Sequence, residues 1–117
     1  MSKVKELKRR IGQAFKVLRK RAGYFARQNW KCCQGCGCAA VPEDKSRYVF
    51  YHAQGNAGMT EEDPSVYLYW GGDDEVQQGM SREGILISLV LEAEGLKVEW
   101  DGSASDAIKV TYVEDEA

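Results

Sequence analysis

The four cysteines of this chain lie within seven residues, and their spacing favours metal or redox chemistry. They are Cys32, Cys33, Cys36 and Cys38. Cys33, Cys36 and the following Gly37 form a C-x-x-C-G pattern, which is typical of a metal knuckle. In such a knuckle two thiolates face one ion, and the glycine lets backbone N–H groups turn toward the sulfur atoms. A structural zinc ion takes four sulfur or nitrogen ligands, so this pair needs two further ligands.

Two residues are the best candidates to complete that set. Cys38 is the preferred third ligand, because the adjacent side chains of Cys32 and Cys33 point apart in an extended stretch; Cys32 is the alternative. His52, the only histidine, follows a predicted strand that can run back past the cysteines. The sequence therefore predicts a zinc site formed by Cys33, Cys36, Cys38 and His52.

Two other interpretations use the same residues. Cys33 and Cys36 are candidates for a thiol-redox pair, with Lys31 and the basic N-terminal region available to lower a thiol pKa, although no thioredoxin-like βαβ pattern precedes them. In the plainest interpretation the cysteines are small buried or turn residues without a ligand, and His52 is a half-buried histidine with ordinary partners.

Charge is divided unevenly along the chain. Residues 1–31 carry eleven basic side chains and one acid, a formal charge of +10, whereas residues 32–117 carry a formal charge of −12. The two parts can attract each other across the fold, and the acidic part can bind a basic protein partner or the basic helix of a second copy in a homodimer.

A nucleic-acid interface is the weaker alternative. Tyr24, Phe25 and Trp30 follow the basic segment and offer rings for base stacking, but a pI near 5.5 argues against it. Arg27, Trp30 and Cys32 are the candidate residues of a binding site that holds no metal.

The sequence gives little support for an enzyme. It contains no phosphate-binding glycine loop and no serine elbow, and one histidine is available for acid–base work. The acidic runs 61–63 and 73–75 lack the spacing of a calcium loop. We therefore expect a non-enzymatic binding or regulatory protein. No apolar run approaches 18 residues, and no apolar segment follows the charged N-terminus, so we expect a cytoplasmic protein that does not enter a membrane.

The elements that position the cysteines follow from hydrophobic periodicity. Val4, Leu7, Ile11, Phe15 and Leu18 recur at three- and four-residue steps and predict a basic amphipathic helix over residues 1–23 that stops at Gly23. A cysteine loop is predicted over 26–40. Strands are predicted over 48–52, 66–70, 96–100 and 108–112, a polar loop over 53–65, and a helix over 81–94.

These elements predict one domain over residues 1–117. Its fold class is α+β, in the order α-β-β-α-β-β, with two helices packed on one face of a four-stranded, mostly antiparallel sheet and a cysteine-rich loop after the first helix. The sheet and second helix occupy 48–113. The acidic tail 114–117 is expected to fray.

Three segments of the chain, 23–37, 48–52 and 98–103, resemble a family of uncharacterised small bacterial proteins. The similarity covers roughly residues 15–113, and the Cys-Cys-x-x-Cys-Gly run is its most specific part. The resemblance implies a bacterial cytoplasmic protein and singles out Cys32, Cys33, Cys36 and His52. It implies no activity.

Overall fold

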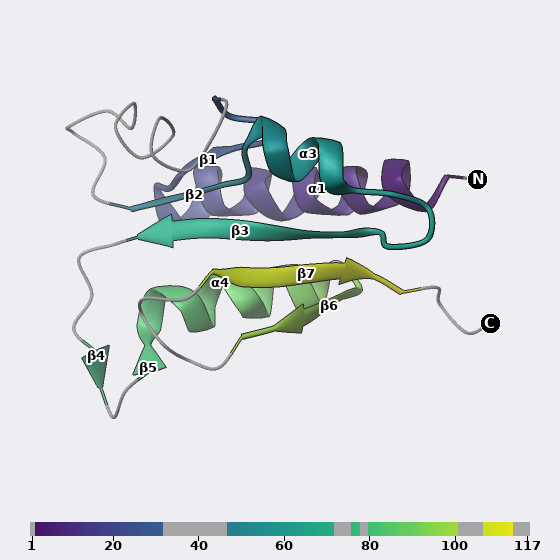
Figure 1. The fold of residues 1–117 in the computed structure, drawn as a ribbon. Coiled ribbons are helices and arrows are strands. Elements are labelled where there is room, and N and C mark those ends of the chain that lie inside the picture. Colours follow the sequence, from purple (N-terminus) through teal and green to yellow (C-terminus); the bar gives the residue numbers. More distant parts are fainter. Residues whose placement is uncertain (1, 32–46, 72–75, 78–79, 101–106, 114–117) are drawn as a thin grey trace.

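The computed structural model describes residues 2–31, 47–71, 76–77, 80–100 and 107–113. Within them the chain has an α+β fold, which confirms the predicted class (Figure 1). The main sheet has five strands, so the prediction of four is wrong. The cysteine loop predicted over 26–40 falls largely outside the described residues, and its first residues belong to a strand.

The main sheet has the strand order β1-β2-β3-β7-β6. Its strands are β1 (Phe25–Arg27), β2 (Tyr48–Phe50), β3 (Ser65–Gly71), β6 (Leu96–Glu99) and β7 (Ile108–Tyr112). β1 pairs with β2 in parallel, and all other neighbours are antiparallel. The last two predicted strands are confirmed, and they pair antiparallel as neighbours, with Leu96 opposite Tyr112. Between β3 and the second long helix, β4 (Val76–Gln77) and β5 (Met80–Ser81) form a separate two-stranded ribbon.

The first helix, α1 (Lys3–Ala22), buries the stripe that its periodicity predicts. The side chains of Leu7, Ile11, Phe15 and Leu18 are at most 1% exposed. Complete burial of side chains of this size contributes about 1.5–3 kcal/mol each. Gly23 ends the helix in the left-handed conformation, with φ of 71° and its N–H donating to Leu18 O, a conformation that glycine adopts without strain.

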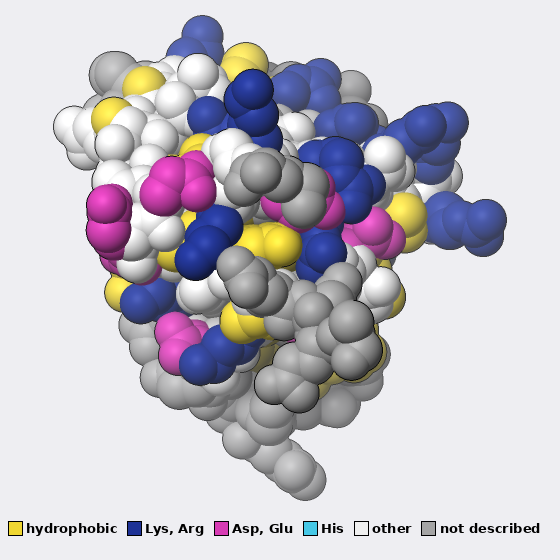
Figure 2. Space-filling view, turned by 90° about the vertical axis from the view of Figure 1, so that its right-hand side faces the viewer, with side chains coloured by type: hydrophobic (Ala, Val, Ile, Leu, Met, Phe, Trp, Pro, Cys, Tyr) yellow, Lys and Arg dark blue, Asp and Glu magenta, His cyan; other side chains and the backbone are white. Residues whose placement is uncertain are grey.

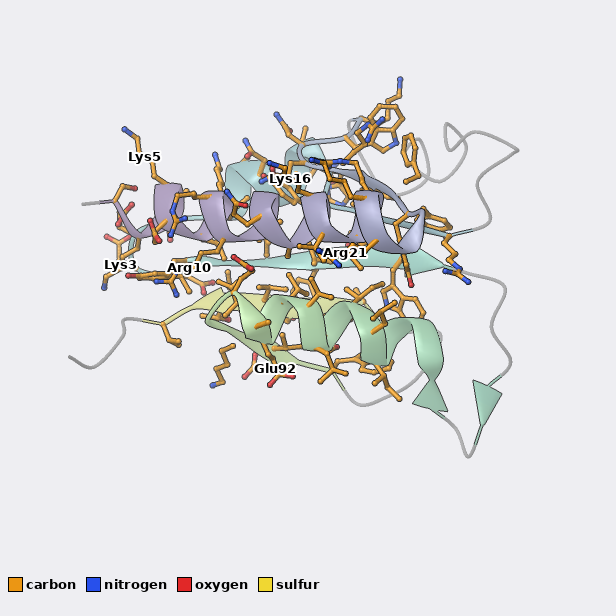
Figure 3. The ribbon with its side chains drawn as sticks, turned by 180° about the vertical axis from the view of Figure 1, so that it is seen from behind. Lys3, Lys5, Arg10, Lys16, Arg21 and Glu92 are labelled. Carbon is orange, nitrogen blue, oxygen red and sulfur yellow. The ribbon has the colours of Figure 1, made fainter. Side chains whose placement is uncertain are left out.

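The second long helix, α4 (Arg82–Ala93), lies on the same face of the sheet as α1 (Figure 3). Between the two helices and the sheet lies the hydrophobic core. From α4 it takes Ile87 and Leu91, and from the strands it takes inward-facing residues such as Val49, Leu68 and Val110. Because strand residues alternate between faces, their neighbours along each strand point to the opposite side of the sheet.

A short helix, α3 (Ala53–Gly58), lies on that opposite side and packs near β3 (Figure 1). The sequence predicted a polar loop here, because Gly55 and Gly58 disfavour a helix. The prediction is wrong because His52 supplies an N-cap: its ring accepts a hydrogen bond from the backbone of Gly55 and satisfies an N–H group of the first turn.

None of the helices in the described ranges combines the length and the apolar character that crossing a membrane requires.

Candidate functional site

An aromatic row crosses the face of the sheet opposite α1 and α4. Its members are Phe25 of β1, Tyr48 and Phe50 of β2, and Tyr67 and Tyr69 of β3. The strand register places Phe25 opposite Tyr48 and Phe50 opposite Tyr69. The ring centroids of Tyr48 and Phe50 are 5.9 Å apart, as are those of Phe50 and Tyr69. Phe50 is fully buried, whereas 53% of Tyr67 is exposed, so the row opens toward the β3 end.

His52 ends this row. Its ring stacks on Tyr69 with centroids 5.0 Å apart, and the residue is 7% exposed. Its Nδ1 accepts a hydrogen bond from the Gly55 backbone N at 3.0 Å. A neutral ring whose Nδ1 accepts must carry its proton on Nε2. This assigns the Nε2–H tautomer to His52 in the state described.

Among the predicted zinc ligands the structure places His52 alone. Cys33, Cys36 and Cys38 lie outside the described residues, as does the alternative ligand Cys32. Within the described part of the chain, no three His, Cys, Asp or Glu side chains are grouped so that they could hold a metal ion. Zinc on Nε2 of His52 would require the ring proton to move to Nδ1, and the Gly55 hydrogen bond would then be lost.

The chain is fixed beside His52 just before the cysteines begin. The backbone N of Trp30 donates to the carbonyl of Tyr51 at 2.8 Å, and the backbone N of Ala53 donates to the carbonyl of Lys31 at 2.9 Å. Lys31, the residue before the first cysteine, is therefore hydrogen-bonded through its backbone to Ala53, the residue after His52. This arrangement holds Lys31, the last described residue before the cysteine run, beside His52 through backbone hydrogen bonds.

The backbone at this point is unusual. Asn29 has φ of 51° and Lys31 has φ of 60°, both in the left-handed region that residues other than glycine seldom adopt. Such conformations cost about 1–3 kcal/mol each and cluster at functional sites. The Lys31 Nζ lies 4.7 Å from the ring centroid of Trp30, so the side chains also help to hold the turn.

Two of the three residues predicted for a metal-free binding site share one contact surface. The guanidinium carbon of Arg27 lies 4.6 Å from the ring centroid of Phe25, and Trp30 meets the same ring edge-on at 5.1 Å. Arg27 is exposed and Trp30 is half-buried. The third, Cys32, lies outside the described residues. Phe25 is 6% exposed and Tyr24 2%, so neither ring is presented for stacking on a nucleic-acid base.

A hollow of about 410 Å³ lies between α3 and β3, on the open side of His52. This volume is within the range of small-molecule sites. Its lining includes His52, Gln54, Asp63, Tyr67, Tyr69 and Lys109. Tyr67 and Lys109 were not among the site residues predicted from the sequence. The signal that would have found them is the period of two along β3 and β7, which turns both side chains away from the core.

Charges around the hollow are balanced. The Nζ of Lys109 lies 3.8 Å from Oε2 of Glu99 and 6.0 Å from the ring centroid of Tyr67. A carboxylate oxygen of Asp63 accepts from the hydroxyl of Ser65 at 2.7 Å. The hollow therefore favours a ligand that is recognised through aromatic contact and hydrogen bonds rather than through charge.

The basic side chains of α1 are only partly neutralised. Figure 2 shows Lys and Arg side chains gathered where α1 lies, at the end of the molecule that carries the N-terminus. Hydrogen bonds from Arg9, and next from Arg10, lower the pKa of Glu6 to about 2. Six basic residues of α1 form no ion pair with another described residue: Lys5, Lys8, Lys16, Arg19, Lys20 and Arg21.

The N-terminus of α1 is held by a carboxylate from the loop before β3. Glu61 accepts hydrogen bonds from the Ser2 hydroxyl, from the Lys3 backbone N at 2.8 Å and from the Val4 backbone N at 3.2 Å. These hydrogen bonds lower the pKa of Glu61, and the bond from the Ser2 hydroxyl has the largest effect. A negative charge here also meets the positive end of the helix dipole.

Searches of curated proteins and of solved structures gave no match. Residues 6–114 match the model of a family described as a domain of unknown function, DUF6891. The matched range includes the whole sheet, the cysteine run and His52. It agrees with the predicted resemblance to an uncharacterised family, while the bacterial origin stays a prediction. The chain therefore belongs to the DUF6891 family.

Proposed function

We propose that this chain is a non-enzymatic binding domain in which the cysteine run holds a structural zinc ion beside His52. One observation supports the proposal above all others: the hydrogen bond from the Ala53 backbone N to the Lys31 carbonyl, 2.9 Å long. Cys33 is two residues from Lys31 along the chain, and His52 precedes Ala53. A residue spans at most about 3.5 Å of extended chain, so the chain allows at most about 7 Å between the Cα atoms of Lys31 and Cys33.

The proposed ligands are the thiolates of Cys33, Cys36 and Cys38 together with Nε2 of His52. Binding at Nε2 moves the ring proton to Nδ1 and removes the acceptor for the Gly55 N–H, so the cap of α3 weakens when the metal binds. Because α3 lines the hollow, metal occupancy would change the shape of that surface. This coupling gives the domain a regulatory character.

Metal analysis of protein purified without chelator tests the zinc site. We expect one zinc per chain, and we expect Cys36→Ser to lose the metal and to lower the thermal unfolding midpoint. Lys16→Ser is the matched control, because it adds the same side chain at an exposed position of α1.

The zinc site would be contradicted if the purified protein contained no metal and its unfolding midpoint changed neither when zinc was added nor in the Cys36→Ser variant. If Cys33 in that protein also reacts rapidly with an alkylating reagent at a pH below the ordinary pKa of a cysteine thiol, the thiol-redox function of Cys33 and Cys36 is supported instead.

A further inference from the structure

The outward face of α4 is apolar. Leu89 is 59% exposed, and Ile85 and Leu86 are each 37% exposed. These three residues lie on one side of the helix, opposite the buried Ile87 and Leu91. A helix that is apolar on both sides is ordinarily covered on both sides, yet in the described part of the chain only the sheet side of α4 is covered.

A second cavity lies next to this stripe. It has a volume of about 220 Å³ and is lined by Ile85, Ser88, Leu89, Glu92, Val98 and Trp100. Ser88 is 8% exposed, and its hydroxyl has no hydrogen-bond partner among the described residues. Buried hydroxyls are almost always paired. The surface of α4 thus offers an apolar stripe, a cavity beside it and a hydroxyl that lacks a partner.

Two opposite charges flank the stripe. Figure 3 shows Arg21 on the side of α4 that faces α1 and Glu92 on the other side. Both side chains are exposed. Neither makes an ion pair with another described residue.

We propose that a second copy of this chain packs on this face, α4 against α4, around a two-fold axis that passes near Leu89. A two-fold axis repeats every contact, so the surface must be complementary to itself. The two-fold axis of a face-to-face dimer lies within the interface, and an axis in the plane of Figure 3 that runs between Arg21 and Glu92 exchanges the positions of these two charges. Glu92 of each copy then meets Arg21 of the other, and the apolar stripes cover each other.

This interface is independent of the zinc site, since it uses neither the cysteines nor His52. It also differs from the homodimer that the sequence suggested, in which the acidic part of the chain binds the basic helix of a second copy. The large apolar side chains exposed together lie on α4.

Sedimentation equilibrium tests the proposal over protein concentrations from about 1 to about 300 µM, with and without chelator. We expect a dimer in both conditions. Leu89→Asp should give a monomer whose far-ultraviolet circular dichroism is unchanged, because the side chain replaced is already largely exposed.

Charge reversal identifies the partner as a second copy. Arg21→Glu and Glu92→Arg should each weaken dimerisation by about tenfold or more, because like charges then meet twice. The double variant should restore the affinity to within about threefold. Lys16→Glu makes the same change of charge on α1 away from α4 and should have little effect (Figure 3).

A chain that stays monomeric at every concentration overturns the proposal. So does a dimer whose affinity is unaffected by Leu89→Asp, or a double variant that dimerises no better than the single ones.

Discussion

Replacing His52 separates its role in capping α3 from a role in binding metal. Alanine removes both the acceptor for the Gly55 N–H and the ring that stacks on Tyr69. Loss of an N-cap acceptor costs about 1 kcal/mol, and loss of a stacked aromatic contact costs about 0.5–1.5 kcal/mol. The ring is also buried, so we expect His52→Ala to lower the free energy of unfolding by about 2–3 kcal/mol.

Asparagine at the same position gives the informative comparison. Its side-chain oxygen can cap the helix, but it offers no imidazole to a metal. In the presence of chelator we expect His52→Asn to cost about 1 kcal/mol less than His52→Ala. Urea unfolding measures this difference, which at a slope of about 2 kcal/mol per molar moves the midpoint by about 0.5 M. The exposed neighbour Gln54, changed to alanine, is the control and should shift the midpoint little.

Zinc added to the same series tests the ligand role. Zinc at about 100 times its dissociation constant stabilises a folded protein by about 2.7 kcal/mol. If His52 is a ligand, the asparagine variant loses most of that gain although its cap is intact. Equal unfolding midpoints for the two variants in chelator would refute the cap argument, and full zinc stabilisation of His52→Asn would remove the histidine from the ligand set.

Two further predictions concern stability. Gly84→Ala should destabilise the chain by about 1–2 kcal/mol although alanine favours helices, because a Cβ would lie 2.4 Å from ring atoms of Trp100; a raised thermal midpoint would contradict this. The pKa values of Glu6 and Glu61 lie below the ordinary 4.5, and that of Glu6 is about 2. The contributions of these two carboxylates to the stability of the folded chain are therefore complete above pH 4.5 and are lost as the pH falls toward the folded-state pKa values. The urea midpoint should therefore fall between about pH 4.5 and 2, and less so in Glu61→Gln; the same pH dependence in that variant would contradict the argument.

Elements with a long, clear period were predictable from the sequence. α1 repeats its apolar residues over about four turns, and β6 and β7 each alternate between more buried and more exposed residues. These patterns reflect burial of one face, and each pattern can be recognised from residues close together in the chain. The predicted strands around Val49 and Leu68 were also found, because their apolar runs are bounded by turn residues.

Elements that depend on distant partners were not predictable. β1 has three residues, too few to show alternation, and its parallel pairing with β2 joins Phe25 to Tyr48 across the cysteine run. α3 contains two glycines and forms where His52 provides a cap. Of the candidate site, His52 was chosen as a ligand for its residue type, whereas its hydrogen bond to Gly55 depends on the local backbone, which residue types alone do not reveal.

The short strand β1 has a consequence for the behaviour of the protein in concentrated solution. It is one of the two edge strands of the sheet formed by the described residues, and it is only three residues long, with the exposed Arg27 at its end. Behind it, β2 carries the fully buried Val49 and Phe50. If β1 detached, the unpaired backbone of an apolar strand would face other molecules, and such edges recruit further strands into aggregates. The parallel pairing of β1 with β2 therefore acts as a guard against self-association through the sheet.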